Sequence, residues 1–208
     1  MNIINDLIQW LPASEEPLSS DVFVIQGNSK TWIFDVGCNK QALENITNIQ
    51  GEIGIILSHF HPDHTKNLQL LNLAQSDITV YMGENTSKYI KAHKTVIVTE
   101  ELFIDDGILL HIVPIQATHA KGSVILEVDY KYAFLGDAIY PTHKSGKAAY
   151  NAQLLKEEIK ALESLKATEF HISHRNPVCV SKEAIIRYLK GIYEGRNKNE
   201  PYILVSQR

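Results

Sequence analysis

Short apolar runs bounded by turn residues predict strands in the first half of the chain. Residues 22–26 and 31–35 are two such runs, and the polar segment 27–30 between them predicts a β-hairpin. Residues 53–57 form a short, isoleucine-rich apolar run, which predicts a buried strand. Residues 39–46, between the runs 31–35 and 53–57, could form a helix.

Helical and extended patterns alternate further along. The spacing of apolar residues predicts helices over 65–74 and 86–93 with a strand over 78–82 between them, which is typical of an α/β unit. Strands are predicted over 101–104, 108–115, 124–128, 131–135 and 169–173. Leucine and isoleucine at helical spacing predict a helix over 150–166, and a last helix is predicted over 182–190. Residues 202–205 are predicted to be an edge strand or a packed tail.

Length and composition indicate an ordinary globular protein. The chain has 208 residues, of which 44% are hydrophobic and 21% charged, so we expect a single domain over 1–208. A net charge of −4 without a basic block makes nucleic acid an unexpected partner. No apolar run approaches the length of a membrane span, so no membrane association is expected. The sequence does not determine the oligomeric state.

The cysteines and the first residues indicate the compartment. Cys38 and Cys179 are isolated in the sequence, which fits a reducing environment, and each is expected to be a small buried apolar residue rather than a ligand. Residues 1–10 carry Asp6 and lack the basic start of a secretory signal. A cytoplasmic location is therefore expected.

The segment Ser58-His59-Phe60-His61-Pro62-Asp63-His64 carries the candidate chemistry. Four side chains that can bind a metal follow directly after the predicted strand 53–57, where ligands tend to lie in α/β proteins. Imidazole and carboxylate suit zinc, iron and manganese. Side chains alternate in an extended loop, so His59 and His61 can lie on one side and bind one ion. Asp63 and His64 fall where the chain turns, so they can face a second ion. The alternatives are a chance match and histidines that only cap or pair within a loop.

The pattern His-x-His-x-Asp-His resembles the signature of the metallo-β-lactamase superfamily. Three later segments match the order of ligands that this resemblance implies: Thr118-His119 with Gly122-Ser123, Gly136-Asp137, and Ser173-His174-Arg175. The last segment lacks the glycines that usually flank the histidine in the family. His174 is the better match for the last ligand, and His171 is the competing candidate.

The resemblance implies a complete site and a fold. His59, His61 and His119 would hold a first ion, Asp63, His64 and His174 a second, and Asp137 would bridge them. Asp35, in Asp35-Val36-Gly37, would accept hydrogen bonds from the metal loop or from a ligand histidine; alternatively it caps the following helix. The implied fold is α/β, a four-layer αββα sandwich with the site at the edges of the sheets.

The expected cofactors are two divalent metal ions per chain, with zinc expected and iron or manganese as alternatives. Two ions can share a water and lower its pKa towards neutrality, so a metal-bound hydroxide would attack the substrate, with Asp63 orienting it or taking its proton. Tyr140 is a candidate donor to a developing oxyanion.

The expected function is a dinuclear metal-dependent hydrolase that acts on an ester, thioester or lactone of a small molecule. Asp137, rather than a cysteine, resembles glyoxalase-II-like members and differs from the best-known zinc β-lactamases. The alternatives are a phosphodiesterase or nuclease of the same fold and a non-hydrolytic metal-binding protein.

Overall fold

Two large β-sheets form the centre of the computed structural model, which describes residues 1–74 and 77–205, with the backbone alone at 73–74. The first sheet has the strand order β1-β2-β5-β6-β7-β8-β9. Its strands are β1 (Asn2–Ile3), β2 (Ile8–Leu11), β5 (Val22–Gln26), β6 (Lys30–Phe34), β7 (Glu52–Leu57), β8 (Thr79–Gly83) and β9 (Lys94–Val98). The strands from β6 to β9 are parallel to one another.

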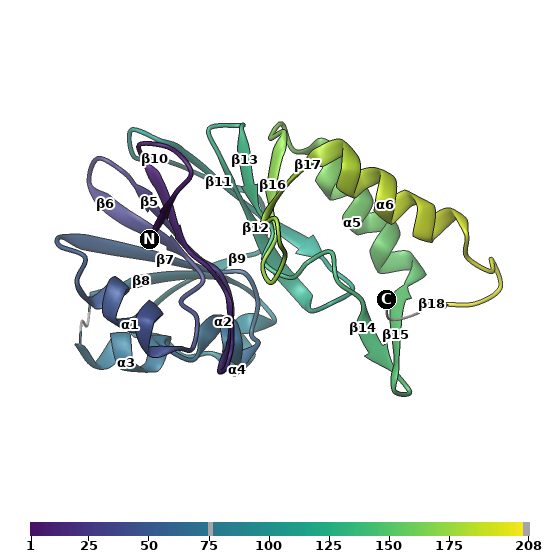
Figure 1. Ribbon diagram of the computed structural model, residues 1–208, viewed down its shortest axis with the longest axis horizontal. Coiled ribbons are helices and arrows are strands. Elements are labelled where there is room, and N and C mark those ends of the chain that lie inside the picture. The colour runs from purple at the N-terminus through teal and green to yellow at the C-terminus, as the bar shows by residue number, and fades with distance from the viewer. Residues whose placement is uncertain (75–76, 206–208) are drawn as a thin grey trace.

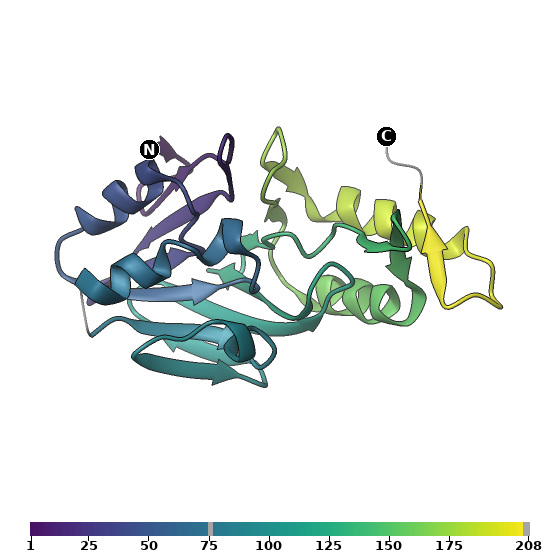
Figure 2. The same ribbon diagram turned by 90° about the horizontal axis from the view of Figure 1, so that it is seen from below.

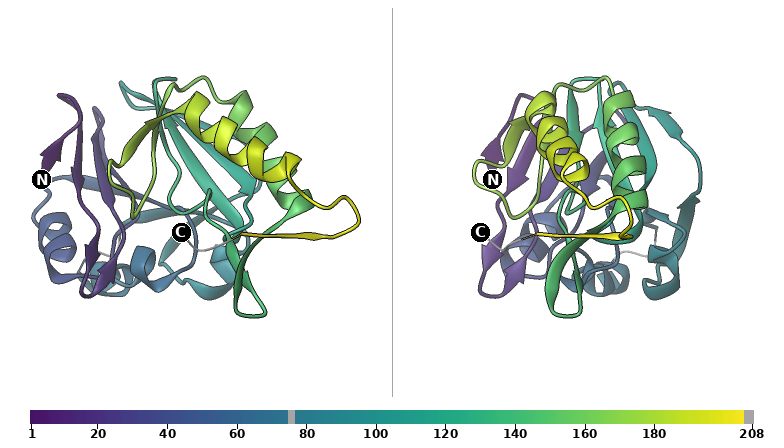
Figure 3. Two further views of the ribbon diagram at one scale, coloured as in Figure 1. Left: turned by 45° about the vertical axis from the view of Figure 1, so that its right-hand side comes forward. Right: turned by 90° about the vertical axis from the view of Figure 1, so that its right-hand side faces the viewer.

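The second sheet has the order β10-β11-β12-β13-β16-β17. Its strands are β10 (Leu102–Asp105), β11 (Leu109–Gln116), β12 (Lys121–Val128), β13 (Tyr132–Phe134), β16 (Glu169–His171) and β17 (Cys179–Ser181). Strands β14 (Thr142–Lys144), β15 (Lys147–Asn151) and β18 (Tyr202–Leu204) form a small separate sheet, and β3 (Ser14–Glu15) pairs with β4 (Leu18–Ser19). The β14–β15 hairpin projects from the body of the molecule (Figure 3).

Helices cover the outer face of each large sheet (Figure 1). On the first sheet lie α1 (Lys40–Thr47), α2 (Pro62–Thr65), α3 (Leu68–Ala74) and α4 (Thr86–Tyr89), and on the second lie α5 (Ala152–Ser164) and α6 (Lys182–Glu194). Figure 2 shows α1 and α3 on the opposite side of the two sheets from α5 and α6. The predicted four-layer αββα sandwich is confirmed. None of the described helices is long and apolar enough to cross a membrane.

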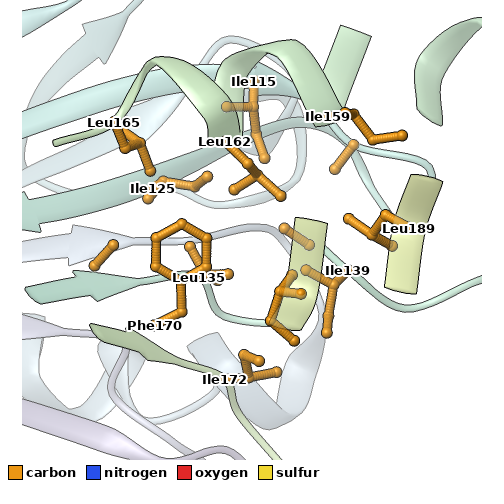
Figure 4. Close-up of a cluster of buried hydrophobic side chains, with 14 of the residues drawn as sticks. Ile115, Ile125, Leu135, Ile139, Ile159, Leu162, Leu165, Phe170, Ile172 and Leu189 are labelled. Atoms are coloured by element: carbon orange, nitrogen blue, oxygen red, sulfur yellow. The ribbon is translucent and has the colours of Figure 1, made fainter. Parts of the chain in front are cut away.

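Three clusters of buried apolar residues hold the four layers together. One joins α1 and α3 to the first sheet through residues such as Ile46 and Leu71. A second, with Phe23, Phe34 and Phe134, lies between the two sheets. The third joins the second sheet to α5 and α6 (Figure 4). Because central strands such as β5, β7 and β12 are buried on both faces, they have near-continuous apolar runs, which is why the sequence predicts them well.

Most predicted elements are present, although several helices have different bounds. The helix predicted over 65–74 is divided between α2, which ends at Thr65, and α3, which begins at Leu68, and the helix predicted over 182–190 continues to Glu194. The helix predicted over 86–93 ends at Tyr89, where Ile90 takes an extended conformation and Tyr89 remains 64% exposed. The helix predicted from residue 150 begins at Ala152, because Asn151 caps it by accepting hydrogen bonds from the backbone N–H groups of Gln153 and Leu154. Tyr150 instead lies in β15 and is fully buried.

Candidate metal centre

The candidate residues lie in loops at one end of the two sheets. Strands β6 and β7 are parallel in the first sheet, and β13 and β16 are parallel in the second. Asp35, the segment 58–64, Asp137 and His174 all follow the carboxyl ends of these strands. A hydrogen bond from the backbone N–H of Val124 to the carbonyl of Ser58, at 2.8 Å, joins the two sheets at this edge. Parallel strands therefore bring together residues from distant parts of the sequence.

The first cluster, His59, His61 and His119, brings three imidazole nitrogens together. His61 Nδ1 lies 2.9 Å from His59 Nε2 and 3.1 Å from His119 Nε2. A proton on His61 Nδ1 can point to only one of the other two nitrogens, so at least one of the two contacts brings two nitrogen lone pairs together. Nitrogen ligands of a single zinc ion, bound at about 2.0 Å, lie roughly 3.3 Å apart. The spacing of the first cluster is close to that arrangement.

Hydrogen bonds to the opposite ring nitrogens fix two of these histidines. His59 Nδ1 lies 2.9 Å from the hydroxyl oxygen of Ser58, and His119 Nδ1 donates to the carbonyl of Pro141 at 3.3 Å. Partners of this kind fix the orientation and the tautomer of a metal-binding imidazole. The Nε2 atoms of His59 and His119 are thereby left facing the cluster.

The second cluster contains Asp63, His64, Asp137 and His174. Asp63 Oδ2 lies 3.0 Å from His174 Nε2 and 3.4 Å from His64 Nε2. His64 Nε2 also lies 3.3 Å from Asp137 Oδ1. The structure thus places His174, and not His171, against Asp63.

Asp137 faces both clusters. Its Oδ2 lies 3.3 Å from His119 Nε2 in the first cluster, while its Oδ1 lies 3.3 Å from His64 Nε2 in the second. The preceding Gly136 has a φ of +54°, and a Cβ there would lie 2.6 Å from the side chain of Ser58. Glycine is therefore required to bring the Asp137 loop this close to the metal loop.

Asp35 lies beneath the metal loop and is 1% exposed. Its carboxylate accepts hydrogen bonds from the backbone N–H and the hydroxyl of Ser58, both at 2.8 Å, and contacts His64 Nδ1 at 2.7 Å. Its φ of +58° is more accessible to aspartate than to most other non-glycine residues. The helix-capping role considered for Asp35 belongs to Asn39, which accepts from the N–H of Ala42.

The loop that carries His174 is held by a residue that the sequence did not single out. Asp21 accepts a hydrogen bond from the backbone N–H of His174 at 3.0 Å, and its own N–H donates to the hydroxyl of Ser173 at 2.9 Å. His174 has a φ of +58°, so Asp21 helps to hold a turn for which this chain lacks the family's glycines. The only signal in the sequence was an acidic residue directly before the apolar run that begins at Val22.

Tyr140 also supports this loop. Its hydroxyl donates to the carbonyl of Ser173 at 2.7 Å. In this structure the single O–H proton of Tyr140 is donated to Ser173, so the role of oxyanion donor stays a prediction. The Ser173 N–H donates to the carbonyl of Gly136 at 3.1 Å, so the loops carrying Asp137 and His174 are joined twice.

The clusters differ in their electrostatics. Burial and neighbouring imidazoles hold the pKa of His59 well below 6.5, and the pKa of His61 is lowered for the same reasons. Burial would also lower the pKa of His64, but the charges of Asp35 and Asp137 outweigh it and raise the pKa well above 6.5. Burial opposes ionisation of Asp137, yet His119 and His64, which lie beside its two oxygens, lower its pKa. In the first cluster the neutral forms of His59 and His61 are therefore favoured, while in the second the ionised form of Asp137 is favoured.

The two clusters fit divalent cations. His64 Nε2 and Asp137 Oδ1 are buried without a hydrogen-bond partner among the described residues, although buried polar atoms are normally satisfied. A cation between them would satisfy both atoms. The donors are imidazole nitrogen and carboxylate oxygen, which suit zinc, iron and manganese.

All seven predicted ligand candidates and Asp35 thus lie together in the structure. Comparison of the sequence with models of protein families agrees with the family that the sequence motifs resemble. Residues 16–174 match the model of the metallo-beta-lactamase superfamily. The chain belongs to this superfamily. None of the curated proteins matches the sequence.

Solved structures of the superfamily show the same fold at low sequence identity. A metallo-beta-lactamase from Pontibacter korlensis is 15% identical with a TM-score of 0.69, covering 94% of this chain and 98% of its own. The archaeal superfamily protein ST1585 from Sulfolobus tokodaii is 18% identical with a TM-score of 0.64, covering 91% and 87%. A structure of the peroxy di-iron species of the chemotaxis sensor ODP is 12% identical with a TM-score of 0.69, covering 91% of this chain and 93% of its own.

Proposed function

We propose that this member of the metallo-β-lactamase superfamily is a dinuclear metal-dependent hydrolase of a small-molecule ester, thioester or lactone. The observation that carries the proposal is the position of Asp137, whose two oxygens each lie 3.3 Å from a histidine of a different cluster. A carboxylate in that position could bridge two ions. The ion in the second cluster would then have four protein ligands, Asp63, His64, Asp137 and His174.

In this proposal the residues have distinct roles. His59, His61 and His119 would hold the first ion, and Asp63, His64 and His174 the second, with Asp137 shared. Two bound divalent ions would lower the pKa of a shared water and polarise the oxygen of the substrate. The hydrogen bond from His174 lowers the pKa of Asp63 against the opposing effect of its burial. The ionised Asp63 would orient the attacking water or accept its proton.

A serine hydroxyl or a cysteine thiol could replace water as the nucleophile, but Ser123 and Cys38 both have other partners. Ser123 donates its hydroxyl proton to the carbonyl of Ala120 at 2.7 Å and is buried. The thiol of Cys38 donates to the carbonyl of Leu18 at 2.8 Å. Water is therefore the proposed nucleophile, and no covalent enzyme intermediate is expected.

The experiment combines metal analysis with a substrate panel. The purified protein would be stripped of metal, reconstituted with Zn²⁺, Mn²⁺ or Fe²⁺, and assayed on p-nitrophenyl acetate, an acyl thioester, an aliphatic lactone and bis(p-nitrophenyl) phosphate. We expect about two ions per chain and metal-dependent turnover of a carbonyl substrate. Turnover of the phosphodiester alone would favour the phosphodiesterase alternative. Two bound iron ions without hydrolysis of any substrate would contradict the proposal and favour the non-hydrolytic metal-binding alternative.

A further inference from the structure

A third group of metal-binding side chains lies at the edge of the second sheet, and it shares no residue with the two clusters above. This edge cluster consists of Glu169 and His171 on β16 and Cys179 on β17. Glu169 and His171 are two residues apart on one strand, and His171 pairs directly with Cys179 across the ladder. All three side chains therefore lie on the same face of the sheet.

His171 is the residue that points to a ligand. It is 2% exposed, and neither of its ring nitrogens has a hydrogen-bond partner in the part of the chain that the structure describes. Its ring contacts Phe134, with centroids 5.1 Å apart, Phe23, at 5.8 Å, and Tyr132, at 6.0 Å. Within the described residues 1–74 and 77–205, none of these three rings makes a hydrogen bond to it. A buried imidazole with two unsatisfied nitrogens is costly, so the site is incomplete as the chain alone forms it.

Burial also prepares His171 as a ligand. It lowers the pKa of the imidazole to about 4, so the ring is neutral at physiological pH and one nitrogen carries a free lone pair. Burial, followed by the nearby charge of Glu169, raises the pKa of the Cys179 thiol. Without a cation, the edge cluster is therefore a thiol, a neutral imidazole and a carboxylate.

The spacing suits one ion. One donor atom from each of the three residues lies within 4.8 Å of the others. Zinc binds sulfur at about 2.3 Å and nitrogen or oxygen at about 2.0–2.2 Å, so donors on one ion lie roughly 3.3–3.7 Å apart. Cys179 is partly exposed, and the side chain of Glu169 is 40% exposed with a long ion pair to Lys131 at 3.8 Å. Both side chains can rotate to close the remaining gap around the fixed imidazole.

The cluster opens into a cavity of about 700 Å³, lined also by Trp10, Leu18, His174 and Val178. Three protein ligands and an accessible fourth position are an arrangement that zinc adopts with a water molecule. Cys179, which the sequence led us to expect as a buried apolar residue, instead lies at the wall of this cavity.

We propose that Glu169, His171 and Cys179 form a separate binding site for one borderline-soft divalent ion of the Zn²⁺ class. On binding, the Cys179 thiol loses its proton to solvent, and the thiolate and the Glu169 carboxylate together balance the two charges of the ion. The ion would join β16 to β17 at the base of the segment 172–178, which carries His174. The role of this site is to clamp that loop.

Cobalt substitution tests the site without interference from the dinuclear centre. A cysteine thiolate bound to Co²⁺ gives an intense near-ultraviolet charge-transfer absorption, whereas the first and second clusters contain no sulfur. We expect Co²⁺ to produce this absorption in the metal-stripped wild-type protein, the Cys38→Ser variant to keep it and the Cys179→Ser variant to lose it. Zinc analysis should show one ion fewer per chain in Cys179→Ser than in Cys38→Ser.

Two outcomes would overturn the proposal. One is a wild-type protein that gives no thiolate absorption at saturating Co²⁺, and the other is an absorption that survives in Cys179→Ser. The His171→Leu variant, which keeps Cys179, should weaken Co²⁺ binding at this site at least tenfold. Unchanged binding in a folded His171→Leu protein would equally contradict the assignment. None of these readouts depends on hydrolytic activity, and the thiolate absorption does not depend on the ions of the other clusters.

Discussion

The two clusters of the candidate centre are neighbours, yet they are built on different principles. The first cluster consists of three imidazoles and no carboxylate, and two of its histidines are oriented by the neutral partners Ser58 and Pro141. The second contains the carboxylates of Asp63 and Asp137, and a third carboxylate, Asp35, lies behind His64 at 2.7 Å.

This difference suggests how each cluster attracts a cation. The first depends on converging lone pairs, so the orientation of each ring decides its affinity. The second depends on negative charge, because the carboxylates that raise the pKa of His64 would also stabilise a bound cation. Asp137 is the residue that belongs to both, and its removal is therefore the most severe test of the comparison.

The largest effect is expected for Asp137→Ala. Both ions should be lost or greatly weakened, and the turnover of the best substrate should fall by more than about a thousandfold, since each ion contributes several kcal/mol to transition-state stabilisation. Elemental analysis and steady-state kinetics would measure the two effects. The Asp6→Asn variant, at an exposed position, is the control. Two ions per chain in a folded Asp137→Ala protein would refute the bridging role.

His61→Ala and His174→Ala should separate the clusters. Each variant should retain about one ion and lose roughly a hundredfold in activity, because each removes a ligand from only one cluster. Titration calorimetry with Zn²⁺ would show which affinity is lost. His93→Ala, at an exposed histidine outside both clusters, should bind both ions normally. Simultaneous loss of both ions in either single variant would mean that the clusters are not independent.

Asp35→Asn tests the charge behind the second cluster. Asparagine tolerates the positive φ of this position, but it lacks the negative charge that orients His64. We expect the affinity of the second cluster to fall roughly tenfold to a hundredfold, with the first cluster unaffected. The exposed Asp105→Asn is the matched control. An equal loss at both clusters would show that Asp35 supports the whole loop rather than His64.

Gly136→Ala tests the approach of the two sheets at the bridging residue. The added methyl group would meet Ser58 at 2.6 Å in a backbone conformation with a φ of +54°. We expect a loss of about 1–3 kcal/mol in the free energy of unfolding, measured in urea. Gly146→Ala has a φ of +76° but no atom within 4 Å of the new Cβ, so it isolates the backbone effect. Equal losses in the two variants would exclude the steric contact as the cause.

The smallest effect concerns Glu158, which is fully buried and accepts from the N–H of Thr118, next to His119 in the first cluster. Burial raises its pKa well above 4.5, against the opposing hydrogen bond from Thr118. The protonated form is therefore favoured in the folded state, and its contribution to stability is lost as the pH rises above 4.5 towards the raised pKa. Over that window the loss is about 1.4 kcal/mol per pH unit.

The Glu158→Gln variant should remove this dependence and be more stable than the wild type at pH 8. Urea unfolding of both proteins at several pH values would measure the difference. A stability difference that does not change with pH would show that Glu158 titrates normally in the folded protein.

The sequence determined the fold class, and it was enough to predict most residues of the candidate centre. Strands such as β7 are apolar throughout because both faces of the sheet are buried, and that local property can be seen in any window of the chain. The segment 58–64 is likewise local, so four metal-binding side chains could be recognised together. The distant residues His119, Asp137 and His174 were placed by their resemblance to an ordered family pattern.

Only the tertiary structure decided which side chains meet. Asp21 and His174 are 153 positions apart and the contact between them has no local signature, and the hydrogen bond of Tyr140 to Ser173 could not be foreseen from a tyrosine in a loop. The edge cluster has the same origin. Its residues look unremarkable along the chain, and they become a group only because β16 and β17 pair in a register that sets His171 opposite Cys179. Periodicity is a property of neighbours in sequence, whereas a site depends on contacts across a sheet, which are fixed only when the layers pack.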